Sequence, residues 1–215
     1  MNVSALVKEI EARVENMPLR NAPALRVLRR EYSKRVKVLP GVDVVKLAAA
    51  LIRHQRVHRF IGDELIACHP SALTTLDRNQ LERLGAGISS WDQADCFASY
   101  LSGPAWREGL IGDTVIVGWA RSKSRWWRRS ALVSTVPLNV KARGGQSDAR
   151  RTLRICGLMD DRDEMIVKAL SWALRALAGR DPQAVRKFVE ENQARLPALV
   201  RREVRHKLAG RKKSG

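Results

Sequence analysis

Residues 161–179, DRDEMIVKALSWALRALAG, carry the clearest helix signal in the chain and indicate its fold class. Asp161 and Glu164 have the spacing of a capping box, and Gly179 is a typical C-terminal cap. Apolar residues recur between them every three to four positions, as on the buried face of an α-helix. These apolar residues are Ile166, Val167, Leu170, Ala173, Leu174 and Leu177.

Trp172 lies outside this apolar stripe. At about 100° per residue it points about 160° away from Leu170, and its neighbours on that side are Lys168 and Arg175. A tryptophan between two cations, opposite the apolar stripe, is unusual for a core residue. It would suit a surface that contacts phosphates and sugars. The alternative is a helix buried on both sides.

The same helical periodicity extends along the chain and predicts an all-α protein. Asp181 and Pro182 form an N-cap and first helical position, and only DTVIVGW, 113–119, has a β-like composition. About ten to twelve short helices separated by Gly, Pro, Ser or Asp are expected. They would suit a compact bundle or an α-solenoid of stacked helix pairs. Residues 140–151 are the best loop candidate, and residues 209–215 form a basic tail that we expect to be flexible.

The net charge of the chain points to a polyanionic partner. There are 40 Lys and Arg against 22 Asp and Glu, which gives +18. Nucleic acid is the first candidate, an anionic membrane surface the second, and a merely basic soluble protein the alternative. No run is apolar enough to span a membrane, and the three cysteines lack any metal or disulfide spacing. We therefore expect a cytoplasmic protein without disulfides.

The positive charge is concentrated between Trp119 and Arg154, where ten Lys and Arg face one acid, Asp148. The segment WARSKSRWWRRS, 119–130, places Trp126 and Trp127 among several arginines. Cations of this kind neutralise phosphates, and aromatic rings stack on bases or sugars. The alternative is that the tryptophans belong to the core, which we expect of at least one of Trp126 and Trp127.

The segment SSWDQADCFASY, 89–100, pairs an aromatic residue with a carboxylate. Ser90 and Gln93 have capping-box spacing, so Trp91 and Asp95 lie four residues apart on one face of a helix. They border the expected core stripe Ala94, Phe97, Ala98 and Leu101. The pair could form a functional site, or it could combine core packing with a structural salt bridge.

His54 and His58 are spaced like zinc ligands on a helix. No carboxylate signature completes such a site, so we expect them to form a polar face with Arg53, Arg56 and Arg59 and expect no metal.

Three of these segments, taken in order, resemble the AlkD-like DNA alkylation repair glycosylases: SSWDQAD, SRWWRRSAL and IVKALSWALRALAGRDPQAVRKFVEEN. The resemblance covers about residues 20–208. It implies an α-solenoid of HEAT-like helical repeats with a concave basic DNA-binding face, forming one domain over residues 1–208. It also implies an enzyme that removes N3- and N7-alkylated purines from duplex DNA, without a cofactor, as a monomer associated with the nucleoid.

The resemblance also implies roles for individual residues. Asp95 falls on the catalytic aspartate, Trp91 and Trp172 on the sugar-contacting tryptophans, and Arg129 on a DNA-contacting arginine. Met165 stands where the family often has an aromatic residue. The further residues expected to contact DNA are Arg125, Arg128, Lys168, Arg175 and Asn21.

Two other functions remain open. A non-catalytic DNA- or RNA-binding helical-repeat protein would share the basic surface and the salt-sensitive binding but would release no base. A protein-binding helical scaffold would need a weakly charged apolar groove, and the charge of +18 argues against it.

Overall fold

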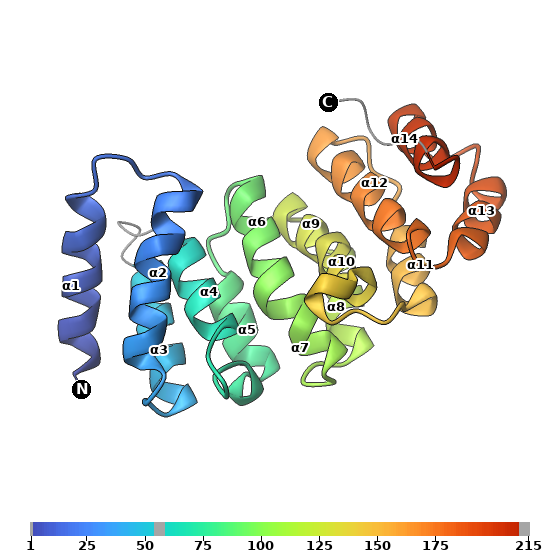
Figure 1. Cartoon of the computed structure of the whole chain (residues 1–215). Coiled ribbons are helices and arrows are strands. Elements are labelled where there is room, and N and C mark those ends of the chain that lie inside the picture. Colours follow the sequence, from blue (N-terminus) through green and yellow to red (C-terminus); the bar gives the residue numbers. More distant parts are fainter. Residues whose placement is uncertain (1, 54–58, 211–215) are drawn as a thin grey trace. The chain divides into compact units, whose positions relative to one another are not determined.

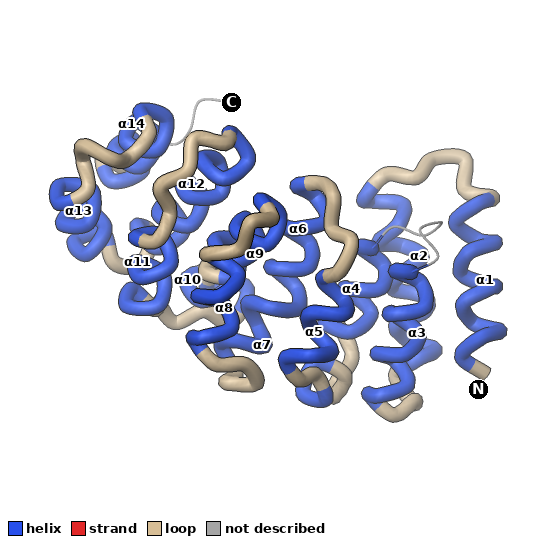
Figure 2. The backbone as a smooth tube through the Cα atoms, turned by 180° about the vertical axis from the view of Figure 1, so that it is seen from behind, coloured by secondary structure: helices blue, strands red, loops and turns tan. Residues whose placement is uncertain are grey.

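The computed structural model describes residues 2–53 and 59–210, and every regular element in these ranges is a helix (Figures 1 and 2). The all-α prediction is therefore confirmed. The chain divides into two compact units, Met1–Gly87 and Ile88–Gly215, each with its own core. That residues 1–208 act as one functional domain stays a prediction.

The first unit is built from helix pairs tied together by apolar contacts and ion pairs. Helix α1 packs against α3, and both α2 and α3 pack against α4. Arg29 of α2 reaches the buried Glu64 of α4 at 2.7 Å. The elements are α1 (Val3–Glu15), α2 (Ala22–Val36), α3 (Gly41–Arg53), α4 (Arg59–Ala67), the 3₁₀ turn η1 (Leu73–Thr75) and α5 (Arg78–Gly85).

The prediction that Arg59 belongs to an exposed polar face with Arg53 is wrong. The Arg59 side chain is buried, and its guanidinium donates to the carbonyl oxygens of Leu84 and Ala86. It thus satisfies the open end of α5, where helix carbonyls lack intrahelical partners. His54, Arg56 and His58 lie outside the described residues.

The second unit stacks its longer helices in two layers. Helices α6, α9, α12 and α14 form one layer, each packing against the next, while α8, α11 and α13 form the other. Such stacking of helix pairs is the arrangement of an α-solenoid. The elements are α6 (Trp91–Phe97), the π-helical turn η2 (Ala98–Ser102), α7 (Gly103–Arg107), α8 (Asp113–Ala120), α9 (Arg125–Ser134), α10 (Val136–Asn139), the 3₁₀ turn η3 (Lys141–Arg143), α11 (Ala149–Gly157), α12 (Glu164–Ala178), α13 (Pro182–Glu191) and α14 (Ala198–Leu208).

The helix ends agree with the sequence in part. Asp181 caps α13, with Pro182 as its first residue, as predicted. Helix α12, by contrast, is capped by Asp163 rather than Asp161, because Asp161 accepts instead from the backbone N–H of Asp163 and pairs with Arg128.

Helix α6 and the loop expected over residues 140–151 also differ in detail. Ser90 is the N-cap of α6 but makes no side-chain cap bond, and Gln93 accepts from the N–H of Ser89. The expected loop contains η3, and α11 already begins at Ala149. The β-like run at 113–119 is helical and forms most of α8.

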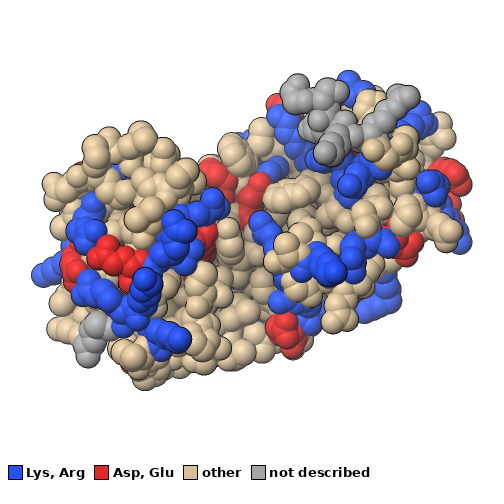
Figure 3. Space-filling model, in the orientation of Figure 1, with Lys and Arg blue, Asp and Glu red and all other residues tan. Residues whose placement is uncertain are grey.

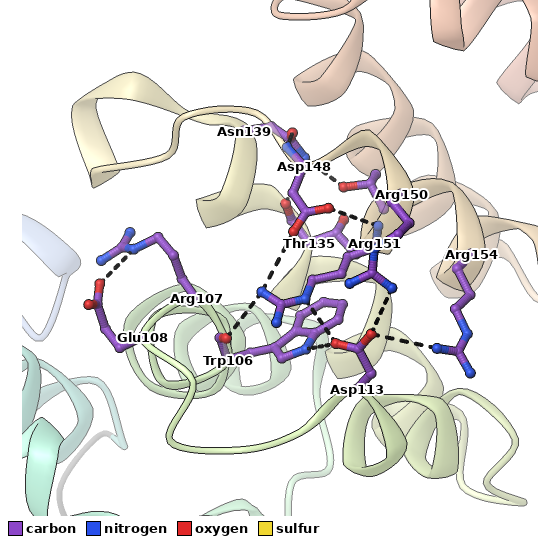
Figure 4. Close-up of polar contacts among 11 residues, drawn as sticks. Trp106, Arg107, Glu108, Asp113, Thr135, Asn139, Asp148, Arg150, Arg151 and Arg154 are labelled. Carbon is purple, nitrogen blue, oxygen red and sulfur yellow. Dashed lines mark hydrogen bonds and ion pairs between the residues drawn. The ribbon is translucent and has the colours of Figure 1, made fainter.

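A network of arginines around Asp113 joins α7, α8 and α11 (Figure 4). Trp106 Nε1 and Arg151 Nε each lie 2.9 Å from the Asp113 carboxylate, and Arg150 lies 3.1 Å from it. Burial works to raise the pKa of Asp113, but these donors hold it below its ordinary value. Part of the positive charge between Trp119 and Arg154 therefore stabilises the fold.

Gly103 should be intolerant of even one added methyl group. A Cβ there would lie 2.8 Å from Ala98 O, Ser134 O and Pro137 Cγ, whereas a Cβ on Gly118 of α8 would meet nothing within 4 Å. We expect Gly103→Ala to destabilise the protein by about 1–3 kcal/mol. The matched Gly118→Ala should stabilise it by about 0.5–1 kcal/mol. Denaturant unfolding of both variants measures the difference, and equal stabilities would contradict this close packing.

Candidate functional site

Helix α6 presents Trp91 and Asp95 in different environments. The core stripe predicted for this segment is confirmed, since Ala94, Phe97, Ala98 and Leu101 are all buried. Trp91, in contrast, is 55% exposed. The Asp95 side chain is only 17% exposed. Trp91 is therefore not a core residue, and Asp95 is a largely desolvated carboxylate one helical turn away from it.

Arg129 of α9 holds the Asp95 carboxylate through both of its oxygens. Its Nε and Nη2 atoms donate to Asp95 Oδ1 and Oδ2, each at 2.8 Å. Its remaining nitrogen, Nη1, donates to the main-chain oxygen of Met165 on α12. Fork-to-fork pairs of this kind are strong and directional. One guanidinium therefore joins three successive helices of the same layer and fixes the plane of the carboxylate.

The two influences on the Asp95 carboxyl oppose each other. Burial raises its pKa above the ordinary value, and the hydrogen bonds and charge of Arg129 lower it, with a net rise. The nearby Asp92 carboxylate adds to the rise. The two short charge-assisted bonds from Arg129 favour the ionised form of this carboxyl and counteract part of the effect of burial. The site thus places an acidic group, paired with one guanidinium, where it is poorly hydrated.

The tryptophans of the segment 119–130 contribute mainly to packing. Trp127 is half-buried and packs against Trp119 and Phe97, with ring centroids 4.7 and 5.9 Å away. Neither of the adjacent tryptophans is fully buried, so the expected core position of at least one is not reached; Trp127 instead packs against the core residues Phe97 and Trp119 from its edge. Trp126 is also half-buried and carries the Arg125 guanidinium 4.6 Å above its ring. This packing fixes the orientation of α9, and so of Arg129.

Trp172 is half-buried on α12, while the whole apolar stripe predicted for this helix is buried. Met165 and Trp172 lie seven residues apart, which is about two turns or 10 Å along one side of the helix. Arg129 meets this helix at the main-chain oxygen of Met165. Next to Trp172, the buried Ser171 hydroxyl donates to Glu203 of α14 at 2.6 Å. Trp172 therefore occupies a well-anchored part of the helix.

The cations expected to contact DNA all have protein partners in the second unit. Arg128 lies 2.8 Å from Asp161 and donates to two carbonyl oxygens of the preceding loop. Arg175 lies 3.4 Å from Glu203. The more exposed ones pair with acids at the start of α12: Arg125 with Asp163 and Lys168 with Glu164.

Asn21 belongs to the first unit, where it caps α2. Its side-chain oxygen accepts from the N–H of Ala24 at 3.0 Å. Its predicted contact with DNA stays a prediction.

The carboxylates that partner these cations were missed by the sequence reasoning. Only the pair Glu164 and Lys168, four residues apart on a helix, leaves a signal in the sequence. The partners of Arg125, Arg128 and Arg175 lie 28 to 38 residues away and are brought together by the stacking of α9, α12 and α14.

The described residues contain no group of three or more His, Cys, Asp or Glu side chains arranged to bind a metal ion. Among the described helices, none combines the length and apolarity needed to cross a bilayer.

The site formed by Asp95 and Trp91 can act through a carboxylate and an exposed indole. Both groups favour a positive charge placed beside them.

A family model described as "DNA alkylation repair enzyme" matches residues 20–208, which is most of the chain and includes every residue of the site. No protein of curated function shows significant sequence similarity to the chain.

Proposed function

The chain belongs to the DNA alkylation repair enzyme family, and from this we propose that it is a DNA glycosylase. Its reaction would be hydrolysis of the N-glycosidic bond of N3- or N7-alkylated purines in duplex DNA. A DNA substrate is what the family implies. We also propose that the protein acts as a monomer and that residues 1–208 form one functional domain. It would act on chromosomal DNA in the cytoplasm.

The observation that carries this proposal is the Asp95 carboxylate, largely desolvated and held by Arg129 at 2.8 Å through both oxygens. A buried ion pair that served only the fold would be equally well placed away from an exposed indole. Here Trp91, 55% exposed, stands one turn before the carboxylate on the same helix. An ordinary structural salt bridge does not account for this exposed aromatic neighbour.

The chemistry asks little more of the protein. Alkylation at N3 or N7 gives the purine a positive charge and makes it a good leaving group, so no general acid is needed. As the bond to the base breaks, the sugar acquires oxocarbenium character, which a fixed carboxylate stabilises electrostatically. We assign this role to Asp95, together with orientation of the attacking water.

The remaining residues would bind and orient the lesion. The indole faces of Trp91 and Trp172 would contact the sugar and add cation–π stabilisation as its charge develops. The cations Arg125, Arg128, Lys168 and Arg175 would contact the phosphates near the lesion, and Asn21 the backbone elsewhere. Arg129 would first of all position Asp95, and its predicted contact with DNA would be additional.

Release of alkylated bases from duplex DNA tests the proposal directly. We expect the protein to free 7-methylguanine from methylated duplex and leave abasic sites that alkali cleaves. If it binds the duplex tightly but frees no base, the family fold serves a binding function in this chain. That is the alternative of a non-catalytic helical-repeat protein.

The rate of base release should fall at acidic pH. Asp95 acts as a carboxylate, so activity is present above its pKa and lost as pH falls through it. Because burial raises this pKa, the midpoint should lie above the ordinary aspartate value of about 3.9. Single-turnover rates across a pH series, at saturating protein, measure this midpoint. A rate that stays constant down to pH values well below that would exclude Asp95 as the charge involved.

A further inference from the structure

Every cation of the second unit that is expected to contact DNA lies within 3.4 Å of a carboxylate of the same chain. For Arg129 the partner is Asp95 itself. The other four partners are Asp161, Asp163, Glu164 and Glu203, which we call the partner carboxylates. The first three belong to the short segment DRDE at the start of α12, directly beside the arginines of α9.

Figure 3 shows Asp and Glu side chains lying among the Lys and Arg side chains of the second unit. A chain with 40 basic and 22 acidic residues could leave its DNA-facing cations unpaired. The partner carboxylates instead neutralise them in the free protein. A phosphate that approaches such a cation must displace a carboxylate, so it gains only the difference between two ion pairs.

These ion pairs differ in how easily they open. Arg125 and Lys168 are about half exposed, at 52% and 53% of their side chains. Their partners, Asp163 and Glu164, are the N-cap and the first residue of α12. Exposed pairs of this kind contribute 1 kcal/mol or less, so a phosphate can replace the carboxylate readily. Arg128 and Arg175 are more buried, and their partners also hold α9 and α14 against α12.

We propose that the partner carboxylates compete with the DNA backbone for these cations and thereby limit the affinity for undamaged duplex. This rests on the proposed function only in assuming that the cations face DNA. A repair enzyme must leave undamaged sites, which vastly outnumber lesions, and the relevant quantity is the ratio of specific to non-specific affinity. The partner carboxylates lower non-specific affinity while the contacts of Trp91, Trp172 and Asp95 with a lesion are unaffected.

The test removes the charges of two partner carboxylates while preserving the hydrogen bond that caps α12. Asp163 caps α12 by accepting from the N–H of Met165 at 2.8 Å, and asparagine caps equally well. Glu164 is the first residue of the helix and pairs with Lys168 four residues on. The variant Asp163→Asn with Glu164→Gln therefore frees Arg125 and Lys168 without removing the cap.

Helix α13 offers a matched control, since it contains none of the site residues. Asp181 caps it by accepting from the N–H of Ala184 at 2.9 Å. Glu191 pairs with Lys187, again four residues apart. The variant Asp181→Asn with Glu191→Gln makes the same change in net charge, removes one capping charge and opens one exposed ion pair.

Binding to a short undamaged duplex, followed over a series of salt concentrations, is the measurement. We expect the α12 variant to bind about 3- to 10-fold more tightly at low salt. Its plot of log K against log salt concentration should be steeper by about 1–2, because each freed cation releases about 0.9 counterion. The α13 control should stay within about 2-fold of wild type.

Equal gains in both variants would mean that net charge alone acts, and no gain in the α12 variant would mean that these pairs do not meet DNA; either overturns the proposal. The measurement uses unmodified DNA and needs no base release. A failure of the glycosylase proposal is therefore distinguishable, since the binding difference would remain. If the enzyme does release base, excess undamaged DNA should inhibit the α12 variant more than wild type.

Discussion

Asp95→Asn should lower the single-turnover rate of base release by about 100- to 1000-fold, the loss typical when one preorganised electrostatic group is removed. Asparagine keeps the shape and one acceptor oxygen for Arg129 but has no negative charge to offer the developing oxocarbenium. Binding to undamaged duplex should persist. The measurement is release of 7-methylguanine by wild type and variant at equal, saturating protein.

The matched control is Asp92→Asn, because Asp92 lies three residues earlier on the same helix and is exposed. It removes the same charge from α6 without touching the pair with Arg129. Its rate should stay within a few-fold of wild type, with the acid limb of the pH profile shifted slightly down, since Asp92 raises the pKa of Asp95. If the two variants lose activity equally, the catalytic carboxylate has been misassigned.

Arg129→Gln should cost both stability and activity. It leaves Asp95 largely buried without its counter-ion, a change that destabilises proteins by about 3–5 kcal/mol when the pair is fully buried. Because the Asp95 side chain keeps 17% exposure, we expect about 2–4 kcal/mol from denaturant unfolding. The nearby Arg125→Gln, which opens an exposed pair with Asp163, should cost about 1 kcal/mol or less.

The activity of Arg129→Gln separates positioning from DNA contact. Arg129 lowers the pKa of Asp95 and so opposes the effect of burial. Without the guanidinium the pKa of that carboxyl should rise further, and the acid limb of the pH profile should move to higher pH. Combining it with Asp95→Asn should cost less stability than the two single losses together, because the partners share one interaction. A variant that keeps its stability and pH profile but loses duplex affinity would make Arg129 a DNA-contacting residue instead.

Much of the helical layout was predictable because it depends on local chemistry. The apolar stripe of α12, the Asp181–Pro182 start of α13 and the core side of α6 all follow from spacing within one helix. The edge position of Trp91 also follows from that geometry. Local reasoning was wrong where a side chain had a distant alternative partner. Asp161 seemed to cap α12 but pairs with Arg128, and Arg59 seemed exposed but caps the end of α5.

The organisation of the candidate site was not predictable from spacing, because its contacts are long-range. Asp95 and Arg129 stand 34 residues apart, and the third contact is a main-chain oxygen, which any residue at position 165 would supply. The positive charge between Trp119 and Arg154 was expected to face a polyanion, but part of it pairs with acids inside the protein. Arg150 and Arg151 are directed to Asp113, and such internal use of charge depends on how α8 and α11 pack.

The guanidinium that joins α6, α9 and α12 has a consequence for how this architecture can vary. In helical-repeat proteins each repeat contacts mainly its neighbours, so repeats can be gained, lost or exchanged with roughly additive effects. Here one side chain makes three consecutive helices of a layer interdependent, through Asp95 and the main chain at Met165. Exchange of repeats between relatives should therefore succeed at either end of the array. A chimaera joined between residues 95 and 129 would take the carboxylate from one parent and the arginine that orients it from the other.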